Sequence, residues 1–415
     1  MLKKHINALQ NLLIALLAVS ALFLFLRQQT DTPMASYLTP GQTTTGVSDS
    51  EEEIPTTAEA VIRIAVSGAY GRYGDLHMTS TSDGFAAIRN LLQEALGSAG
   101  TPEKCSETAF RAALDGTSLY CDWTASLPLS AVCGIVGASA PEEELYVRRM
   151  VLAAGHDSVT LLLTDDKDYM LCTTKVSVEA LLNFISGVQM DTVAFAYELK
   201  SNSITPYSLL HTGHLQEYPL LTSSTGTQPA DPLLSALGFN PNTNSRYTES
   251  NGTEVVRDGE RTLRIEPDST LIYDGGGTFV PEVSISRSDE TVSMYDAILC
   301  ASRTLNQLIS DSDASLCLKT VETTQRGWLV TFDYQADGVL LRLSSGEPAA
   351  SAEVTSNGVT AFTLCLRRYM AEGTENSLLL PLLQALAIAD SSQPGELSIC
   401  YVDSGSTVSA AWLTD

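Results

Sequence analysis

The first pattern along the chain is a long apolar stretch near its beginning. Residues 12–26 are apolar apart from Ser20, and a short basic head precedes them. As a helix with about 1.5 Å per residue, this stretch and its flanking positions would be long enough to cross a bilayer core of roughly 30 Å. The pattern predicts a single transmembrane helix over 8–27. The positive-inside rule then places residues 1–7 in the cytoplasm and the bulk of the chain outside the cell.

Two alternatives to an uncleaved anchor remain for this stretch. Val19-Ser20-Ala21 offers the small residues that a signal-peptide cleavage site needs, and a helix buried in a soluble fold would also be apolar. The bulky run Leu22–Leu26 continues beyond the possible cleavage site, which favours an anchor.

One side of the predicted anchor carries small residues at helical spacing. Ala15, Ala18 and Ala21 follow one another by about one turn, which allows a second membrane helix to approach closely. The same spacing also arises by chance in a segment rich in Leu and Ala. We expect the partner-facing positions to be Leu12, Ala15, Ala18, Ala21, Leu22 and Leu26.

Beyond the anchor, polar residues give way to alternating apolar patterns. Residues 28–59 are rich in Ser, Thr, Pro and acids without an apolar period, and they predict a disordered stalk. Residues 60–199 combine strand-like alternation with amphipathic helical stretches such as 83–96, which predicts an N-terminal α+β domain. A polar connector over 200–232 follows.

The second half of the chain is rich in turn signals. Residues 233–285 contain Asn251-Gly252 and Asp258-Gly259 between short strand-like runs, and they predict a small domain built on an antiparallel meander. Residues 286–415 again alternate helices with strands, which predicts a C-terminal α+β domain. The overall prediction is an α+β protein with one N-terminal transmembrane helix, followed by extracytoplasmic domains of antiparallel sheets with helices.

The composition narrows the possible roles. The chain has 24 Lys and Arg against 49 Asp and Glu, a formal net charge of −25, while 44% of its residues are apolar. Such acidity argues against binding to nucleic acids, because phosphate contacts need clustered basic residues. The eight cysteines lie beyond the anchor without any C-x-x-C pair, and most occupy apolar runs. We expect most of them to be buried thiols, although disulfides are possible in an exported segment.

No familiar catalytic or metal-binding pattern stands out. His211 and His214 are three residues apart, but Gly213 and nearby prolines argue against a helix and predict a polar loop. The glycine-rich run 67–74 lacks the spacing of a phosphate-binding loop, and the acidic run 165–168 is typical of a turn. We therefore expect no enzyme activity, no catalytic, metal-binding or cofactor-binding residues, no cofactor, and no small-molecule substrate.

Several segments resemble one known family. The first similarity is the order of the predicted parts: basic head, membrane helix, polar stalk and α+β domains. The others are three segments: the strand Leu119–Trp123 followed by Leu127-Pro128-Leu129, the meander from Arg246 to Tyr273, and the ending from Leu397 to Leu413. In this combination the chain resembles the YycH/YycI family, and its length is closer to YycH. It differs from the family in its eight cysteines and in Ala411, which stands where a proline is usual. The residues that match the family motifs are Arg246, Tyr247, Gly252, Gly259, Arg261, Leu263, Ile265, Tyr273, Tyr401 and Trp412.

The resemblance implies a regulatory role without catalysis. Members of the family are membrane-anchored regulators of a WalK-type two-component sensor kinase in Gram-positive bacteria, in signalling for cell-wall homeostasis. The implied partners are the membrane, a sensor histidine kinase and a YycI-like protein. The alternatives are an extracytoplasmic binding or cell-envelope assembly protein without a kinase partner, and a hydrolase with an unfamiliar site.

Overall fold

The computed structural model describes most of the chain after residue 56. The described residues are 57–414, except 142, 202–203, 214–215, 226–229, 279, 281–291, 310–311 and 390–394. They all belong to one compact unit, residues 54–415. No helix among them is long and apolar enough to cross a membrane. The predicted transmembrane helix 8–27 and the head 1–7 lie outside the described residues.

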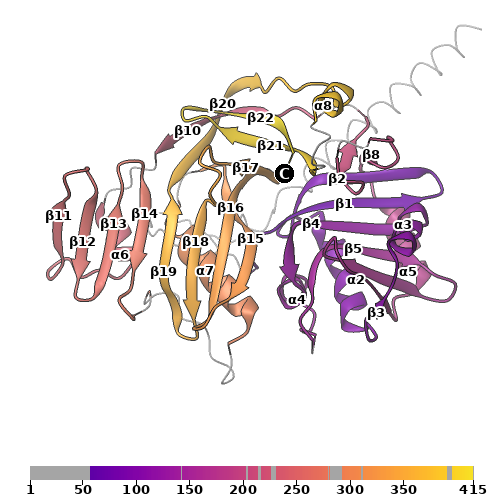
Figure 1. Ribbon diagram of the computed structural model, residues 1–415, viewed down its shortest axis with the longest axis horizontal. Coiled ribbons are helices and arrows are strands. Elements are labelled where there is room, and N and C mark those ends of the chain that lie inside the picture. The colour runs from indigo at the N-terminus through magenta and orange to yellow at the C-terminus, as the bar shows by residue number, and fades with distance from the viewer. Residues whose placement is uncertain are drawn as a thin grey trace, which may run out of the picture. The chain divides into compact units, whose positions relative to one another are not determined.

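The first half of the unit is a nine-stranded antiparallel sheet with the order β3-β7-β6-β5-β4-β1-β2-β8-β9 (Figure 1). Its strands are β1 Val61–Gly68, β2 Gly71–Thr79, β3 Glu103–Lys104, β4 Ser118–Pro128, β5 Tyr146–Ala154, β6 Val159–Thr164, β7 Tyr169–Thr173, β8 Asp191–Phe195 and β9 Leu209–His211. Its helices are α2 Phe85–Gly97, α3 Glu107–Asp115, α4 Leu129–Val136 and α5 Val178–Gly187.

Alternation along the central strands explains why helices cover both faces of this sheet. On β4, Leu119, Cys121 and Trp123 join the main core, whereas Tyr120 between them joins a second core with Phe110 of α3. Successive side chains of a strand point to opposite faces, so an almost continuous apolar run needs a cover on each side.

The second half is built on a larger sheet with the order β11-β12-β13-β14-β19-β18-β16-β17-β21-β22-β10-β20, to which β15 adds by pairing with β16. Its strands are β10 Pro219–Thr225, β11 Ser245–Thr248, β12 Glu254–Asp258, β13 Arg261–Ile265, β14 Thr270–Asp274, β15 Ser315–Thr323, β16 Trp328–Ala336, β17 Val339–Arg342, β18 Ala350–Thr355, β19 Gly358–Cys365, β20 Arg367–Asn376, β21 Leu397–Asp403 and β22 Thr407–Thr414. Its helices are α6 Ala230–Ala236, α7 Met294–Asn306 and α8 Leu382–Ile388. The pairing is antiparallel except between β17 and β21.

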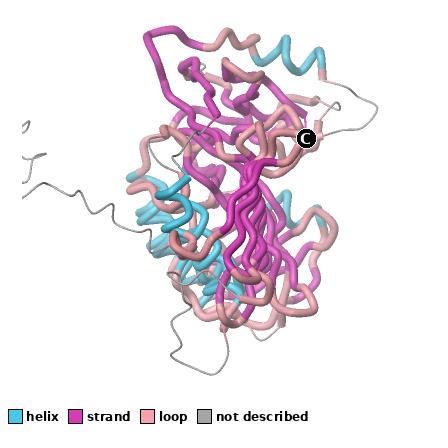
Figure 2. The backbone as a smooth tube through the Cα atoms, turned by 90° about the vertical axis from the view of Figure 1, so that its left-hand side faces the viewer, coloured by secondary structure: helices cyan, strands magenta, loops and turns pink. Residues whose placement is uncertain are grey.

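The two halves share a core. Helix α7 packs on β15, β16, β18 and β19, and it also contacts α4 of the first half. At that contact Gly134 faces the ring of Tyr295, where a Cβ atom would come within 2.2 Å of the ring. One continuous cluster of buried apolar residues runs through both sheets. Helix α8 stands apart from the other helices, at the top of Figure 2.

The structure confirms the α+β class with sheets that are mainly antiparallel. It also shows one sheet where the sequence predicted separate pieces, because β14 of the meander pairs with β19 and β10 of the predicted connector pairs with β20 and β22. The predicted stalk over 28–59 is wrong at its end. Ala58 is fully buried, and Glu59 accepts hydrogen bonds from Ser315 and Gln335.

Candidate functional site

Charged side chains lie buried in the middle of the first sheet. Arg63 of β1 is paired in register with Asp122 of β4, and Asp122 is in turn paired with Arg149 of β5. Two further acids complete the group from outside these strands. We call the set Arg63, Asp122, Arg148, Arg149, Asp166 and Glu396 the central charge cluster.

Glu396 is the member that comes from the far end of the chain. It lies directly before β21, is 4% exposed, and forms ion pairs with all three arginines. Its Oε2 accepts a hydrogen bond of 2.9 Å from Arg149 Nη2, and Arg149 Nε donates to the Tyr120 hydroxyl at 3.0 Å. One carboxylate therefore joins the end of the chain to two strands of the first sheet.

The other two acids balance the remaining positive charge. Asp122 lies 3.5 Å from Arg148 Nε and 3.6 Å from Arg149 Nε, and Asp166 forms ion pairs with the same two arginines. Burial opposes ionisation of Asp122, but Arg149, Arg148 and Arg63 together hold its pKa well below the usual range. Burial and the nearby Asp122 raise the pKa of Glu396, against the influence of the arginines. Three acids facing three bases make a compensated ion-pair network.

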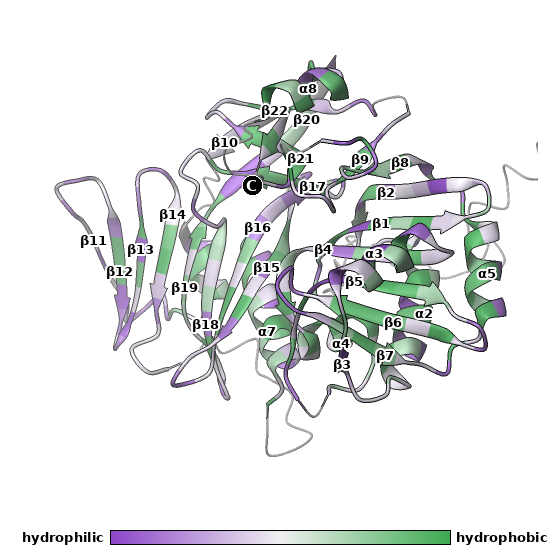
Figure 3. Cartoon of the chain, turned by 45° about the vertical axis from the view of Figure 1, so that its right-hand side comes forward, coloured by the Kyte–Doolittle hydropathy of each residue, from purple (hydrophilic) through white to green (hydrophobic). Residues whose placement is uncertain are grey.

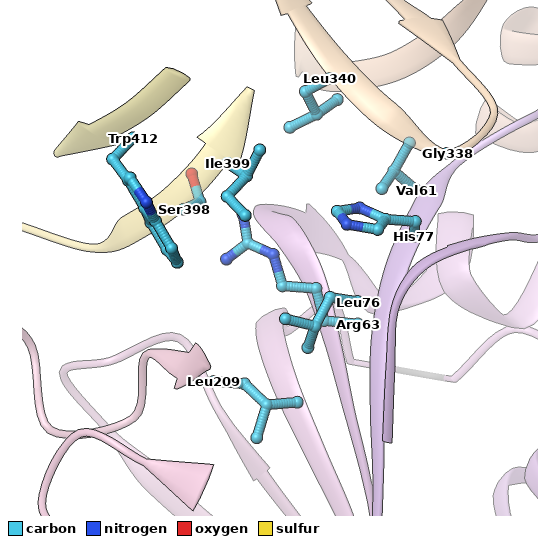
Figure 4. A pocket seen from close by; sticks show the side chains of 10 residues that line it. All are labelled: Val61, Arg63, Leu76, His77, Leu209, Gly338, Leu340, Ser398, Ile399 and Trp412. Carbon is cyan, nitrogen blue, oxygen red and sulfur yellow. The ribbon is translucent and has the colours of Figure 1, made fainter. Parts of the chain in front are cut away.

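A narrow cavity adjoins this cluster between strands of the two sheets. It is lined by Arg63, Leu76, His77, Gly338, Ile399 and Trp412, among others. In the view of Figure 4, the Arg63 side chain lies between Trp412 and His77. The cavity volume is about 10 Å³, which is room for about one water molecule, whereas sites for organic ligands measure roughly 300–1,000 Å³. This arrangement serves packing between the sheets rather than binding of an organic ligand.

Two histidines lie close together at the cavity, and one of them, His77, lines it. His77 is 2.8 Å from the Tyr218 hydroxyl, and its ring centroid lies 6.2 Å from that of His211. Burial, with smaller effects from His211 and Arg63, lowers the pKa of His77 to about 3. The prediction that His211 belongs to a polar loop is wrong, because it ends strand β9 and is 5% exposed. His214 lies outside the described residues.

The most unusual surface of the described residues is around α8. Leu378 is 100% exposed, Leu380 44%, Leu383 78% and Ile388 71%. We call these four residues the α8 surface. The segment 377–389 that contains them has no charged residue, although the chain as a whole is strongly acidic. Figure 3 shows α8 coloured as hydrophobic.

Helix α8 is apolar on more than one side. Ala385 is buried, and Leu382 and Leu386 pack with it against Leu397 and Leu210. Leu383 and Ile388 point away from that contact and are exposed. A helix that is apolar all round is normally enclosed by protein or lipid. Beside it is a groove of about 400 Å³, lined by Leu378, Ile388, Ala410 and Trp412 among others.

The family-motif residues of the meander have structural roles. Gly252 and Gly259 adopt φ angles of +91° and +63° in the two predicted turns, a conformation that favours glycine. Leu263 and Tyr273 are buried, and the Tyr273 ring stacks on Phe362 at 5.2 Å. Ile265 is partly buried against the same core.

The charged motif residues of the meander, Arg246 and Arg261, contact side chains next to it. Arg246 pairs with Asp231 at 2.6 Å, and Tyr247 is 45% exposed. Arg261 donates to Asp258 at 3.1 Å, and its guanidinium lies 5.4 Å from the Phe239 ring centroid. The structure does not gather these residues into one pocket.

The two motif residues at the end of the chain lie elsewhere. Tyr401 is 3% exposed in β21. Trp412 lines the groove beside α8, and its indole N–H donates to the Leu380 carbonyl at 2.9 Å. Of the predicted motif residues, Trp412 is the one that adjoins the α8 surface. The predicted anchor residues 12–26 lie outside the described part of the chain.

Sequence reasoning missed both the charge cluster and the α8 surface. A signal for the first was present, since Arg63, Asp122 and Arg149 each interrupt an apolar strand. A charge in such a position is buried and needs a partner. The signal for the second was the uncharged segment 377–389 on an acidic chain.

The cysteines of the described residues form no disulfides. The eight cysteines are thiols, six of them buried, as the sequence predicted for most of them. Across the described part of the chain, no group of three His, Cys, Asp or Glu side chains is arranged to hold a metal ion.

No protein-family model matches the chain, and no curated protein or solved structure matches it either.

Proposed function

We propose that this protein is a single-pass membrane protein whose C-terminal bulk lies outside the cell and regulates a sensor histidine kinase by protein–protein contacts. The N-terminus is cytoplasmic in this proposal, and the partners are the kinase and a YycI-like protein. The role requires no catalysis. The apolar run over residues 12–26 and the resemblance of the meander and the C-terminal strands to YycH support the proposal.

The observation that carries the proposal is the α8 surface. Burying apolar area is the main driving force for protein association, and the centres of interfaces are depleted in charge. A soluble surface rarely leaves several large aliphatic side chains exposed together. Leu378, Leu383 and Ile388, each more than 70% exposed, meet this description on a chain with a net charge of −25.

The position of Trp412 connects this surface with the family resemblance. Its ring lines the groove beside α8, and its N–H group holds the Leu380 carbonyl. Aromatic side chains of this kind often anchor interfaces because they bury a large area at little entropic cost. We therefore assign the kinase contact to the α8 surface together with Trp412.

The test is co-purification of the full-length protein from bacterial membranes in mild detergent, with the recovered proteins identified by mass spectrometry. A sensor histidine kinase should be recovered with the wild type. The double variant Leu383→Glu/Ile388→Glu should lower its recovery by about tenfold or more, since each charge costs over 1 kcal/mol when an apolar contact is closed over it. Both residues are exposed, so folding is not at risk.

Tyr70→Glu is the matched control. Tyr70 is 93% exposed on the turn between β1 and β2, so this variant adds a charge to an exposed hydrophobic residue elsewhere. It should leave kinase recovery unchanged. Equal loss in both variants, or no kinase with the wild type, would reject the proposal. Capture of the wild type by purified wall polymer in place of a kinase would favour the alternative of a cell-envelope assembly protein.

A further inference from the structure

Strand β22 has one side that the second sheet leaves partly open. It pairs with β21 from Val408 to Thr414, but on its other side β10 pairs only with its first two residues. No other strand among the described residues pairs with that side. We call this side over 410–414 the β22 edge. It borders the groove of about 400 Å³ beside α8, which Ala410, Trp412 and Thr414 help to line.

One hydrogen bond shows which main-chain groups the β22 edge presents. The N–H group of Ala410 donates to the Ser377 hydroxyl at 2.9 Å, on the side away from β21. Successive residues of a strand alternate in the side to which their N–H and C=O groups point. The main-chain groups of Trp412 and Thr414 therefore also point away from β21. Leu378, which follows Ser377, lines the same groove, so these groups lie where the groove opens beside the strand.

The β22 edge lacks the features that normally protect an open edge. Native sheets discourage a further strand with charges, prolines, bulges or very short edge strands. Two other end strands of this protein follow that rule: β3 consists of Glu103 and Lys104, and β11 has four residues including Arg246. The run 410–414 has neither charge nor proline, and it pairs with β21 without a register shift. This edge is therefore suited to receive another strand.

The groove determines which side chains such a strand carries. None of the described residues that line it is charged, and Leu380, Ile388 and Leu397 contribute aliphatic side chains. Burying a charge there without a partner would be costly, so uncharged, apolar side chains fit best. The volume of the groove is within the range of binding sites for small ligands, which suits a short segment of chain rather than a whole helix.

We propose that an extended, uncharged segment of the partner adds to the β22 edge as a further strand and places its apolar side chains in the groove beside α8. The segment takes the place beside β22 that β10 leaves after Val408. Main-chain hydrogen bonds to Trp412 and Thr414 align it, and the groove selects alternate side chains. The inference rests on the proposed kinase contact at the α8 surface, and it adds the conformation and polarity of the segment that the partner contributes.

Two variants at Thr414 test the main-chain contacts. Thr414 is exposed, and Thr414→Pro removes an N–H group that points away from β21, which an edge strand tolerates. The matched control Thr414→Val keeps this N–H group and changes only the side chain. In co-purification from membranes, Thr414→Pro should lower kinase recovery by about tenfold, whereas Thr414→Val should leave it unchanged.

A peptide probe reports on strand addition without the kinase. The probe is fluorescein-labelled Thr-Leu-Thr-Leu-Thr-amide, and its binding to the full-length protein in detergent is measured by fluorescence anisotropy. Two further forms are N-methylated, one at the leucines and the other at the threonines. Because only alternate N–H groups of an added strand face the edge, one form should bind like the parent and the other about tenfold more weakly or less. Thr414→Pro should weaken binding of the parent peptide, and Thr414→Val should not.

Three peptide results would overturn the inference: no binding of the parent, equal binding of both N-methylated forms, and equal binding to the wild type and Thr414→Pro. Kinase recovery that falls in Leu383→Glu/Ile388→Glu but not in Thr414→Pro would reject strand addition and leave the kinase contact in place. The expected peptide pattern without any recovered kinase would support strand addition and reject the kinase as the partner. Dimerisation in sedimentation that Thr414→Pro abolishes, without peptide binding, would make a second copy of this chain the occupant instead.

Discussion

The central charge cluster and the α8 surface reverse the usual distribution of polar and apolar groups. The cluster buries four charged side chains, Arg63, Asp122, Arg149 and Glu396, of which Arg149 is 1% exposed and Glu396 4%; Arg148 and Asp166 complete it at a more exposed edge. The α8 surface leaves Leu378 and Leu383 largely in solvent. The two are close in sequence, since α8 ends at Ile388 and Glu396 precedes β21. The difference teaches that the polarity of a side chain does not by itself decide whether it is buried in this protein. The buried charges are tolerated because each has an oppositely charged partner, whereas the leucines are exposed because no described residue covers them.

The largest expected effect tests the buried side of this comparison. Replacement Glu396→Ala removes one of the two carboxylates that all three arginines share, and breaking a buried pair costs roughly 3–5 kcal/mol. We expect the free energy of unfolding of the full-length protein, measured with a denaturant, to fall by about that amount. Asp168→Ala is the control, because Asp168 pairs with Lys104 while both are more than two-thirds exposed, and such pairs are worth about 1 kcal/mol or less. Equal losses would show that the cluster is not compensated as described.

A second effect, of intermediate size, depends on pH. The pKa of His77 falls from 6.5 to about 3 in the folded state, so on acidification the unfolded chain takes up a proton before the folded one does. Stability that is complete above pH 6.5 is therefore lost as the pH falls toward 3. At pH 5 the loss from this residue is about 2 kcal/mol.

The variant His77→Gln isolates this contribution. It should reduce the loss of unfolding free energy between pH 7.5 and pH 5 by about 2 kcal/mol relative to the wild type. His156→Gln, at a side chain that is 96% exposed, should leave the pH dependence as it is. A slope that is the same in His77→Gln and the wild type would mean that the pKa of His77 does not differ between the folded and the unfolded chain.

The smallest expected effect tests the exposed side. Leu383→Ala on α8 should change the free energy of unfolding by no more than about 0.5 kcal/mol, the usual range for a surface position. Leu305→Ala removes a fully buried leucine from α7 and should cost about 2–5 kcal/mol. Denaturant unfolding of the two variants checks the contrast. A large loss at Leu383 would show that α8 belongs to the core rather than to an interface.

Local patterns predicted much of the fold. The predicted antiparallel meander is present as β11 to β14, and its turn residues Gly252 and Gly259 have positive φ angles. These features depend on neighbouring residues alone. The amphipathic stretch over 83–96 likewise located helix α2, which spans Phe85–Gly97, and the strand Leu119–Trp123 lies within β4.

The features that could not be predicted from the sequence are those that depend on contacts between residues far apart along the chain. The strand β10 has few buried residues, and its pairing with β20 and β22 is set by residues that follow much later. Glu396 gives no local sign that it reaches Arg63, more than 300 positions earlier. His211 lies in a stretch with Gly213 and looked like a loop, but pairing of β9 with β8 buries it. Both candidate sites depend on such long-range contacts, which a pattern of neighbours does not encode.

The place of β10 in the second sheet has a consequence for how the chain matures. The strand is held between β22 on one side and β20 on the other, with Leu221 opposite both Val408 and Ala371. During synthesis β10 emerges long before either partner, so its edges stay open until β20 and then β22 have been made. Open edges are where newly made chains stick to one another. Strand β22, Thr407–Thr414, is the later of the two partners to be made, so a chain truncated before Thr407 leaves one edge of β10 unpaired and open to another chain.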